Sequence, residues 1–222
     1  MYVPPWFAEA RPEVLHALIT GHPLGTLVTH GPDGLDANHI PFEFEPGFGS
    51  GGRLIGHVAR ANPVWVEAKD NATEKQDVLV IFQGPEAYVS PNWYPSKHET
   101  HRQVPTWNYQ VVHVHGQMIF HDDEKYVRGV VARLTRTHES GTGDAKPWRM
   151  TDSAPEYIDG MLQNIVGVEI VVTKMIGKFK LSQNREARDK TNAAQQLIER
   201  GKAVGQSMLD IDKKMEKDKP GA

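Results

Sequence analysis

The chain has 222 residues, a formal net charge of −3 at pH 7 with neutral histidines, and no cysteine. Its composition is that of an ordinary globular domain, and the absence of cysteine excludes disulfides, thiolate catalysis and cysteine-ligated zinc or iron–sulfur sites. A mildly acidic chain also lacks the basic character of a dedicated nucleic-acid binder, so DNA is only weakly supported as a partner.

The first part of the chain carries one helix signal, then strand signals, then a second helix signal. Residues Pro12–Gly21 are predicted to form a helix, because their apolar side chains recur at helical spacing behind a first-turn proline. Three β-rich stretches joined by glycine-rich turns are then predicted as strands: 25–30, 35–44 and 53–58. A short helix is expected at Asn62–Ala68, with Asn62 as its cap.

In the rest of the chain, the apolar run Asp77–Gln83 predicts a buried central strand, and Glu86–Ser90 is expected to turn back from it after Gly84-Pro85. Ser90–Pro105 is predicted to be a long polar loop of the kind that carries function. The remaining predicted elements are a strand at 107–120, a helix at 122–138, a flexible connection at 141–150, a helix at 154–162, a β-rich stretch at 165–181 broken near Gly177, and a helical segment from about 184 interrupted at Gly201 and Gly205.

The strands outnumber the long helices and are joined mainly by hairpin signals, which predicts a mainly β, α+β fold: an antiparallel barrel with peripheral helices. Residues 1–183 are expected to form the barrel with its inserted helices, and 184–222 a C-terminal helical extension ending in a polar tail. The start lacks the features of a signal peptide, and no apolar run is long enough to cross a membrane. We therefore expect a cytoplasmic protein.

Two segments carry groups suited to an anionic ligand with a flat ring. Arg60 ends a strand just before the helix that Asn62 begins, where free N–H groups favour an anion. The alternative is a surface arginine beside an ordinary capped helix. The segments Ser90–Lys97 and Val104–Tyr109 supply aromatic rings, a hydroxyl, an amide and a cation, which a charged ring system with a phosphate requires. The alternative is that these rings close one end of the barrel.

Two other patterns point to no site. Gly47–Gly52 matches the letters of a dinucleotide-binding glycine motif, but a strand follows it where that motif needs a helix, so a hairpin turn is favoured. His113 and His115 would share one face of a strand, but no carboxylate completes a metal-binding set with them. We expect no metal, and favour histidines that line a polar barrel or face a cofactor.

Several longer motifs occur together, in this order: His39-Ile40-Pro41, Gly56–Pro63, Phe82–Pro85, Tyr88–Lys97, Val104–Tyr109 and Lys180–Arg185. With these motifs the chain resembles the PaiB-like family of FMN-binding negative transcriptional regulators, from Met1 to about Arg200. The resemblance implies an FMN-binding split β-barrel, as in pyridoxamine-phosphate oxidases and flavin reductases, that works as a homodimer with FMN at the subunit interface. It also implies repression of protease and sporulation genes. The alternative function is a flavin-dependent oxidoreductase that uses NAD(P)H or another donor.

The resemblance also implies a set of FMN-binding residues. Their expected contacts are the phosphate or ribityl chain for Arg60, His57 and Asn62, a second phosphate contact for Lys97 and Ser96, the flavin faces for Trp93, Trp107 and Tyr109, a ring edge for Asn108, and the groove wall for His39. The segment Lys180–Arg185 is expected to approach the cofactor from the partner subunit. No catalytic residue is predicted, because FMN would itself carry the redox chemistry.

Overall fold

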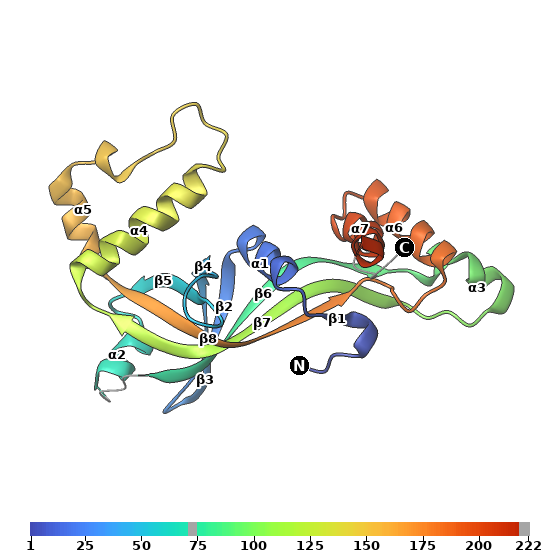
Figure 1. The fold of residues 1–222 in the computed structure, drawn as a ribbon, viewed down its shortest axis with the longest axis horizontal. Coiled ribbons are helices and arrows are strands. Elements are labelled where there is room, and N and C mark those ends of the chain that lie inside the picture. The colour runs from blue at the N-terminus through green and yellow to red at the C-terminus, as the bar shows by residue number, and fades with distance from the viewer. Residues whose placement is uncertain (71–74, 218–222) are drawn as a thin grey trace. The chain divides into compact units, whose positions relative to one another are not determined.

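A computed structural model describes residues 1–70 and 75–217 of the chain (Figure 1). The chain divides into two compact units, which we describe separately. Unit 1 contains residues 1–15, 83–112 and the described residues from 176 onward, and unit 2 contains residues 16–82 and 113–175. Three long strands run through both units: β6 (Gln76–Val89), β7 (Thr106–His121) and β8 (Ile165–Lys180).

Unit 2 is built from a barrel and several helices. Besides its share of the long strands, it contains β2 (Leu24–Gly31), β3 (Gly34–Pro41), β4 (Glu43–Glu45), β5 (Arg53–Ala59), α2 (Pro63–Asp70), α4 (Glu124–Glu139), the 3₁₀ turn η3 (Met150–Asp152) and α5 (Pro155–Leu162). Helix α1 (Pro12–Gly21) begins in unit 1 and ends in unit 2.

The sheet of unit 2 closes on itself. The strand order is β3-β2-β6-β7-β8-β5-β4, and only Phe42 separates β3 from β4 in the chain, so the two ends of this order meet. A Cβ atom on Gly56 of β5 would lie 3.1 Å from Cγ2 of Ile40 and 3.2 Å from Cδ1 of Phe42, so β5 approaches the join closely. The result is a barrel, in agreement with the predicted fold class.

Helix α4 covers the outside of the barrel at β5. Its buried Val130 and Leu134 form a core cluster with Ile55, and Tyr126 packs against that cluster. The helix begins after Asp123, whose carboxylate accepts a hydrogen bond of 3.0 Å from the backbone N–H of Tyr126. This N-cap and the apolar stripe explain why the segment predicted at 122–138 is helical.

Unit 1 is built on the other ends of the long strands. Its remaining elements are η1 (Pro5–Phe7), β1 (Ala8–Glu9), η2 (Pro91–Trp93), α3 (Pro95–Thr100), α6 (Ala187–Glu199) and α7 (Val204–Lys217). The last two helices pack tightly, since a Cβ atom on Gly205 of α7 would lie 2.6 Å from the carbonyl oxygen of Ala194 on α6. Gly201, at a φ of 68°, makes the turn between them. The expected polar tail falls partly on residues 218–222, outside the described residues.

Three local predictions were wrong. No hairpin forms at Gly84-Pro85, because β6 continues to Val89; β2 pairs with β6 only at Leu79–Ile81, so Pro85 lies beyond that pairing. Strand β8 does not break at Gly177, which instead pairs with Glu9 of β1. The stretch 90–105 is not a plain loop, because it contains η2 and α3.

Two further predictions hold in part. The interruption expected at Gly201 is present, but Gly205 lies inside α7, and the strand expected at 35–44 is divided at Phe42 into β3 and β4. The other predicted helices and strands are confirmed to within a few residues, and α1 has the predicted bounds. Among the helices of the described residues, none has the length and apolar character needed to cross a membrane.

Candidate functional site

The predicted cofactor-binding residues fall into two groups, one in each unit. Those of unit 2 are His39, His57, Arg60 and Asn62, and those of unit 1 are Trp93, Ser96, Lys97, Trp107, Asn108 and Tyr109. Several of these side chains already bind atoms of their own unit, and a side chain engaged in this way is not free for a ligand.

Arg60 follows β5, and its guanidinium is already engaged. Its Nε donates to the carbonyl oxygen of Gln163 at 2.7 Å, and its Nη2 donates to that of Ile165 at 3.3 Å. The same Nη2 forms an ion pair of 2.6 Å with Asp122, and the hydrogen bond from Arg60 lowers the pKa of that carboxyl. An anion bound at Arg60 would therefore compete with Asp122 for the guanidinium.

Asn62 caps helix α2 with both its side chain and its backbone. Its Oδ1 accepts the N–H of Val64 at 3.0 Å, and its carbonyl oxygen accepts those of Trp65 and Val66 at 3.0 and 3.2 Å. Its Nδ2 donates to Oδ1 of Asn38 at 2.8 Å. The first turn of α2 is thus satisfied from within the chain, and an anion there would have to displace this cap.

Of the two histidines of this group, His57 is the one with an unsatisfied buried atom. Its Nδ1 is buried and has no hydrogen-bond partner among the described residues. Burial lowers the pKa of His57, which favours the neutral imidazole. His39 lies on β3 with an exposed side chain. In unit 2, His57 is therefore the predicted residue with a buried polar atom that lacks a partner among the described residues, and His39 is the predicted residue with an exposed side chain.

In unit 1, Ser96, Lys97 and Trp93 help to fasten α3 and η2 to α6. The N–H and Oγ of Ser96 donate to the carboxylate of Asp189 at 3.0 and 2.5 Å, and Ser96 is only 1% exposed. Nζ of Lys97 donates to Oδ1 of Asn92. The carbonyl oxygen of Trp93 accepts a hydrogen bond of 2.8 Å from Asn192. These contacts stabilise the fold of unit 1, and Ser96 has no surface to offer a ligand.

The two aromatic residues Trp107 and Tyr109 point away from this packing. They lie two residues apart on β7 and so share one face, while Asn108 points to the opposite face. Asn108 is fully buried, and its Nδ2 donates to Oγ of Ser182 at 2.9 Å. Trp107 is 53% exposed, and its ring packs edge-on against Tyr88 of β6 with ring centroids 6.1 Å apart. The structure thus separates the aromatic pair from the amide that the same motif contains.

Two lysines of β8 complete this face. Nζ of Lys178 lies 5.4 Å from the centroid of the Tyr109 ring, and Nζ of Lys180 donates to the carbonyl oxygen of Trp107 at 2.8 Å and to Oγ1 of Thr106. We call Tyr88, Trp107, Tyr109, Lys178 and Lys180 the aromatic–lysine face of unit 1.

The charges of this face are not compensated within the unit. Burial lowers the pKa of Lys180, and the neighbouring cations Lys178 and Arg185 lower it further. No ion pair in the described part of the chain joins any of these three cations to a carboxylate. A bound anion would relieve their mutual repulsion, and the rings beside them could stack on a flat ligand. The sequence predicted a role for the segment that begins at Lys180 but not for Lys178. The available signal was that Lys178 and Lys180 lie two residues apart on a predicted strand, so their side chains share one face.

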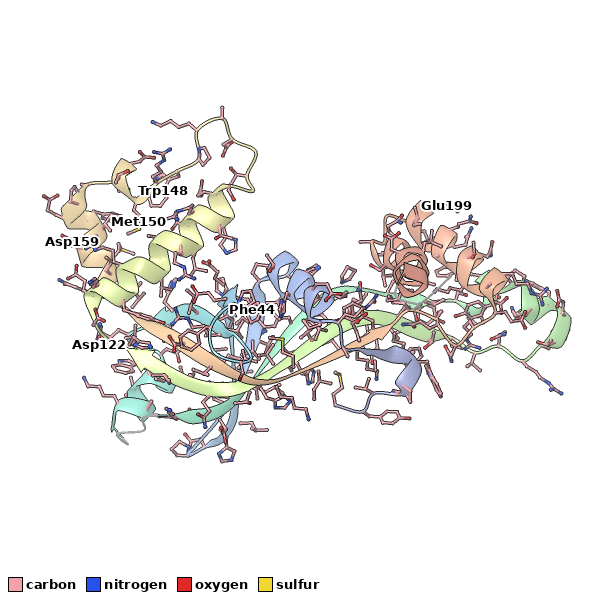
Figure 2. The ribbon with its side chains drawn as sticks, in the orientation of Figure 1. Phe44, Asp122, Trp148, Met150, Asp159 and Glu199 are labelled. Carbon is pink, nitrogen blue, oxygen red and sulfur yellow. The ribbon has the colours of Figure 1, made fainter. Side chains whose placement is uncertain are left out.

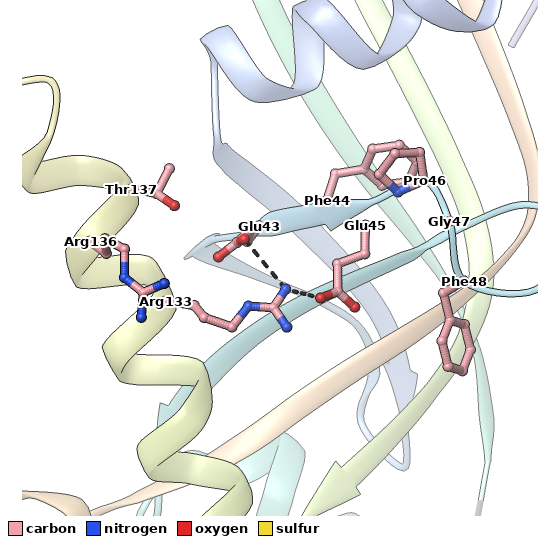
Figure 3. Close-up of a pocket in the computed structure, with 9 residues that line it drawn as sticks. All are labelled: Glu43, Phe44, Glu45, Pro46, Gly47, Phe48, Arg133, Arg136 and Thr137. Atoms are coloured by element: carbon pink, nitrogen blue, oxygen red, sulfur yellow. Dashed lines mark hydrogen bonds and ion pairs between the residues drawn. The ribbon is translucent and has the colours of Figure 1, made fainter.

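Unit 2 contains a separate cavity of about 560 Å³ between α4 and the segment around β4 (Figure 3). Its lining residues are Glu43, Phe44, Glu45, Pro46, Gly47, Phe48, Arg133, Arg136 and Thr137. None of the predicted site residues is among them. Arg133 lies between the two carboxylates, forming ion pairs with Glu43 at 3.4 Å and with Glu45, so its charge is already compensated.

A chain of ion pairs continues from this cavity to the barrel surface. Glu45 also binds Arg53, and Nη1 of Arg53 donates to the buried Glu169 at 2.7 Å. Burial by itself would raise the pKa of Glu45, but hydrogen bonds from Arg53 and Arg133 hold it below the usual value. The hydroxyl of Tyr126 donates to Glu169 at 3.1 Å, and burial together with that carboxylate raises the pKa of Tyr126. This network ties α4 to the barrel.

The histidines and carboxylates do not gather into a metal site. In the parts of the chain that the structure describes, no group of three or more such side chains is placed to hold a metal ion.

Comparison with known protein families shows which family the chain belongs to. Residues 1–174 match the FMN_bind_2 family, whose description is "Putative FMN-binding domain". The chain belongs to this family. A relative from Bacillus subtilis, the protease synthase and sporulation protein PAI 2, is 32% identical over 197 residues, which cover 89% of this chain and 89% of the relative. The resemblance to PaiB-like proteins is thereby confirmed.

The chain is also similar to proteins from fungi. An uncharacterised protein of Emericella nidulans is 31% identical over 242 residues, covering 95% of this chain and 96% of the relative.

Solved structures support the fold of the FMN_bind_2 chain. The flavocytochrome Anf3 from Azotobacter vinelandii has a TM-score of 0.56 at 12% identity, covering 85% of this chain and 77% of its own. The FAD and heme binding protein from Mycobacterium smegmatis has a TM-score of 0.53 at 16% identity, covering 82% and 78%. These likenesses concern the fold alone, and they agree with the predicted split barrel.

Proposed function

We propose that this chain binds FMN, and that the aromatic–lysine face of unit 1 takes part in holding it. The observation that carries the proposal is the combination on one face of exposed aromatic rings with lysines that no carboxylate compensates within the described residues. FMN has the complementary parts, a flat isoalloxazine ring and a phosphate. Membership of the FMN_bind_2 family supports the choice of this flavin.

Each residue of the face would make one kind of contact. Trp107 and Tyr109 would stack on the ring, which buries apolar surface on both partners. Lys178 and Lys180 would bind the phosphate through charge-assisted hydrogen bonds. Separately, the family resemblance implies FMN contacts from His57 and Arg60 of unit 2, and Arg60 would make one only after its guanidinium is released from Asp122. When bound, FMN supplies hydride and electron chemistry, so these residues need only bind and orient it.

The test is a titration of the protein with FMN and, separately, with riboflavin, which lacks the phosphate. Quenching of flavin fluorescence reports binding. We expect FMN to bind more tightly than riboflavin. The double variant K178Q/K180Q should weaken FMN binding by about tenfold or more while leaving riboflavin binding nearly unchanged, because only the phosphate contacts are lost. Trp107→Ala should weaken both flavins, because stacking is common to both.

Lys202→Gln is the matched control, because Lys202 is an exposed lysine of the same unit, in the turn between α6 and α7. It removes a positive charge without touching the face, and FMN binding should stay at the wild-type level. Wild-type protein that binds neither flavin would refute the proposed function. Equal binding of FMN and riboflavin would refute the role given to the lysines.

The proposal includes a homodimer, as the family resemblance implies. Trp107 and Tyr88 are 53% and 47% exposed, and burial of such rings against a second copy would favour association. Sedimentation equilibrium should then give about twice the monomer mass of 24.8 kDa. A monomer mass at all concentrations would contradict the dimer and leave flavin binding to its own test.

We also propose that the FMN-bound dimer acts in gene regulation. The support is the family resemblance and the sporulation-related name of the Bacillus subtilis relative. The net charge of −3 favours action through a partner protein over extensive contact with DNA phosphates. Band-shift assays at several salt concentrations separate the two, since direct binding weakens steeply as salt rises. Bleaching of the bound flavin by NADH or NADPH under anaerobic conditions would instead favour an oxidoreductase.

A further inference from the structure

A second cavity of unit 2 combines an apolar wall with two arginines. It has a volume of about 580 Å³ and lies between one face of α4 and the segment 147–151. The helix contributes Thr135, Arg136 and Glu139, and the segment contributes Trp148, Arg149 and Met150. Figure 2 labels Trp148 and Met150 on the segment that runs alongside α4. The volume is within the range of pockets that hold small organic ligands.

The two arginines of this pocket, Arg136 and Arg149, form no ion pair among the described residues, 1–70 and 75–217. Arg133, one turn earlier on α4, forms ion pairs with Glu43 and Glu45. Glu139, the acidic residue of the lining, accepts the backbone N–H of Trp148 at 2.9 Å. The lining therefore contains two arginines and one glutamate, and the carboxylate of that glutamate already accepts a hydrogen bond.

The same hydrogen bond helps to hold the aromatic wall. It ties the backbone of Trp148 to the last turn of α4, while the Trp148 side chain is 42% exposed. Met150 lies beside it in the lining, and its flexible thioether adapts to the edge of an aromatic ring. A flat apolar group can therefore pack against Trp148 with its charged substituent near the arginines, whose planar guanidinium groups suit a carboxylate, sulfonate or phosphate.

We propose that this pocket binds a small planar aromatic anion, a ring system with a single acidic substituent. It shares no residue with the aromatic–lysine face, so the inference does not depend on FMN binding. The arginines would bind the acidic group, and Trp148 with Met150 would contact the ring. A neutral ring of the same size would lose the charge contacts, and an inorganic anion would lose the ring contacts.

The test uses naphthalene-2-sulfonate as the probe, with 2-naphthol as its neutral analogue and sulfate as the anion without a ring. Isothermal titration calorimetry on the full chain should give saturable binding of the sulfonate, at least about tenfold tighter than of either analogue, with one sulfonate per protomer when K178Q/K180Q removes the cations of the aromatic–lysine face. The double variant R136Q/R149Q should abolish that difference. Trp148→Phe should keep the heat of binding but remove the part of the tryptophan fluorescence change that comes from residue 148.

Two controls keep the result specific to the pocket. Lys146→Gln removes an exposed positive charge next to the same segment but outside the lining, and it should bind the sulfonate as the wild type does. The K178Q/K180Q variant should keep the sulfonate binding that depends on Arg136 and Arg149, because its two lysines belong to the other site. Absence of saturable binding up to millimolar sulfonate in the folded wild type would overturn the proposal. So would unchanged binding by R136Q/R149Q, whose fold is checked by circular dichroism.

Discussion

The buried carboxylate of Asp189 should be one of the main determinants of the stability of unit 1. It lies in the first turn of α6, is 0% exposed, and accepts hydrogen bonds from the N–H and Oγ of Ser96 at 3.0 and 2.5 Å. Gln103 adds a longer contact of 3.4 Å. No ion pair among the described residues includes Asp189, so hydrogen bonds and the helix N-terminus stabilise its charge.

The expected cost depends on what replaces the carboxylate. Asp189→Ala leaves two buried donors of Ser96 without an acceptor, at about 1–3 kcal/mol each, so the free energy of unfolding should fall by about 2–6 kcal/mol. Asp189→Asn should cost only about 1 kcal/mol. The amide oxygen can still accept the N–H of Ser96, and the serine hydroxyl can turn to accept from the amide nitrogen.

Urea unfolding followed by circular dichroism measures these differences. Glu13→Ala is the control, because Glu13 is an exposed acidic residue in the first turn of α1 and reports the helix-dipole contribution alone, at most about 1 kcal/mol. In a double-mutant cycle, Ser96→Ala and Asp189→Ala should be strongly non-additive, since they remove the same contact. An Asp189→Ala protein within about 0.5 kcal/mol of wild type, or an asparagine variant as unstable as the alanine one, would refute this reasoning.

Three further predictions compare the unfolding free energies of variants at other residues. Gly205→Ala should lower the free energy of unfolding by about 1–3 kcal/mol, because its Cβ would meet a backbone oxygen at 2.6 Å. Gly160→Ala on α5 should raise the free energy of unfolding by about 0.5–1 kcal/mol, because alanine favours the helix and nothing lies within 4 Å of its Cβ. Asp123→Ala removes the cap of α4 and should cost about 1 kcal/mol in the same urea assay, whereas Asp123→Ser should restore most of it. For Glu9, burial alone would raise the pKa, but Arg11 holds it below the ordinary 4.5. The ionised Glu9 carboxylate therefore contributes its full stabilisation above pH 4.5 and loses it as the pH falls through the lower pKa of the folded state. The difference in unfolding free energy between wild type and Glu9→Gln should shrink from pH 7 to about pH 3. A difference that stays constant would contradict the role given to the Glu9–Arg11 pair.

Much of the fold follows from the periodicity of apolar residues in the sequence. The two wrongly predicted strand breaks, at Pro85 and Gly177, have a common physical cause. Pro85 and Gly177 are breakers in an isolated strand, yet β6 and β8 run through both. At Gly177, a Cβ would lie 2.7 Å from the backbone oxygen of Glu9 and 2.4 Å from Leu15, so the glycine permits a close approach and makes no break. Local propensity cannot reveal this, because Glu9 and Gly177 are neighbours only in the folded chain.

The same limit applies to the site. Ser96 was a reasonable candidate for phosphate binding next to Lys97, but Asp189, 93 residues later, already uses both of its donors. Arg60 is in the same position, with Asp122 as its partner. A sequence lists donors and acceptors without showing which of them satisfy one another. The lysines of the aromatic–lysine face stand out only when the carboxylates around them are known.

The motif Val104–Tyr109 illustrates why a family signature alone cannot assign contacts. Alternation along β7 sends Trp107 and Tyr109 to an open face and Asn108 to a buried one, where its amide donates to Ser182 and to the sulfur of Met208. One short motif thus contains two ligand candidates and one residue that holds α7 against the sheet. Loss of flavin binding in an Asn108 variant would therefore reflect a disturbed unit 1, whereas its loss in a stable Trp107 variant would concern the ligand itself. Measuring unfolding and FMN affinity together on both variants separates packing from recognition within this motif.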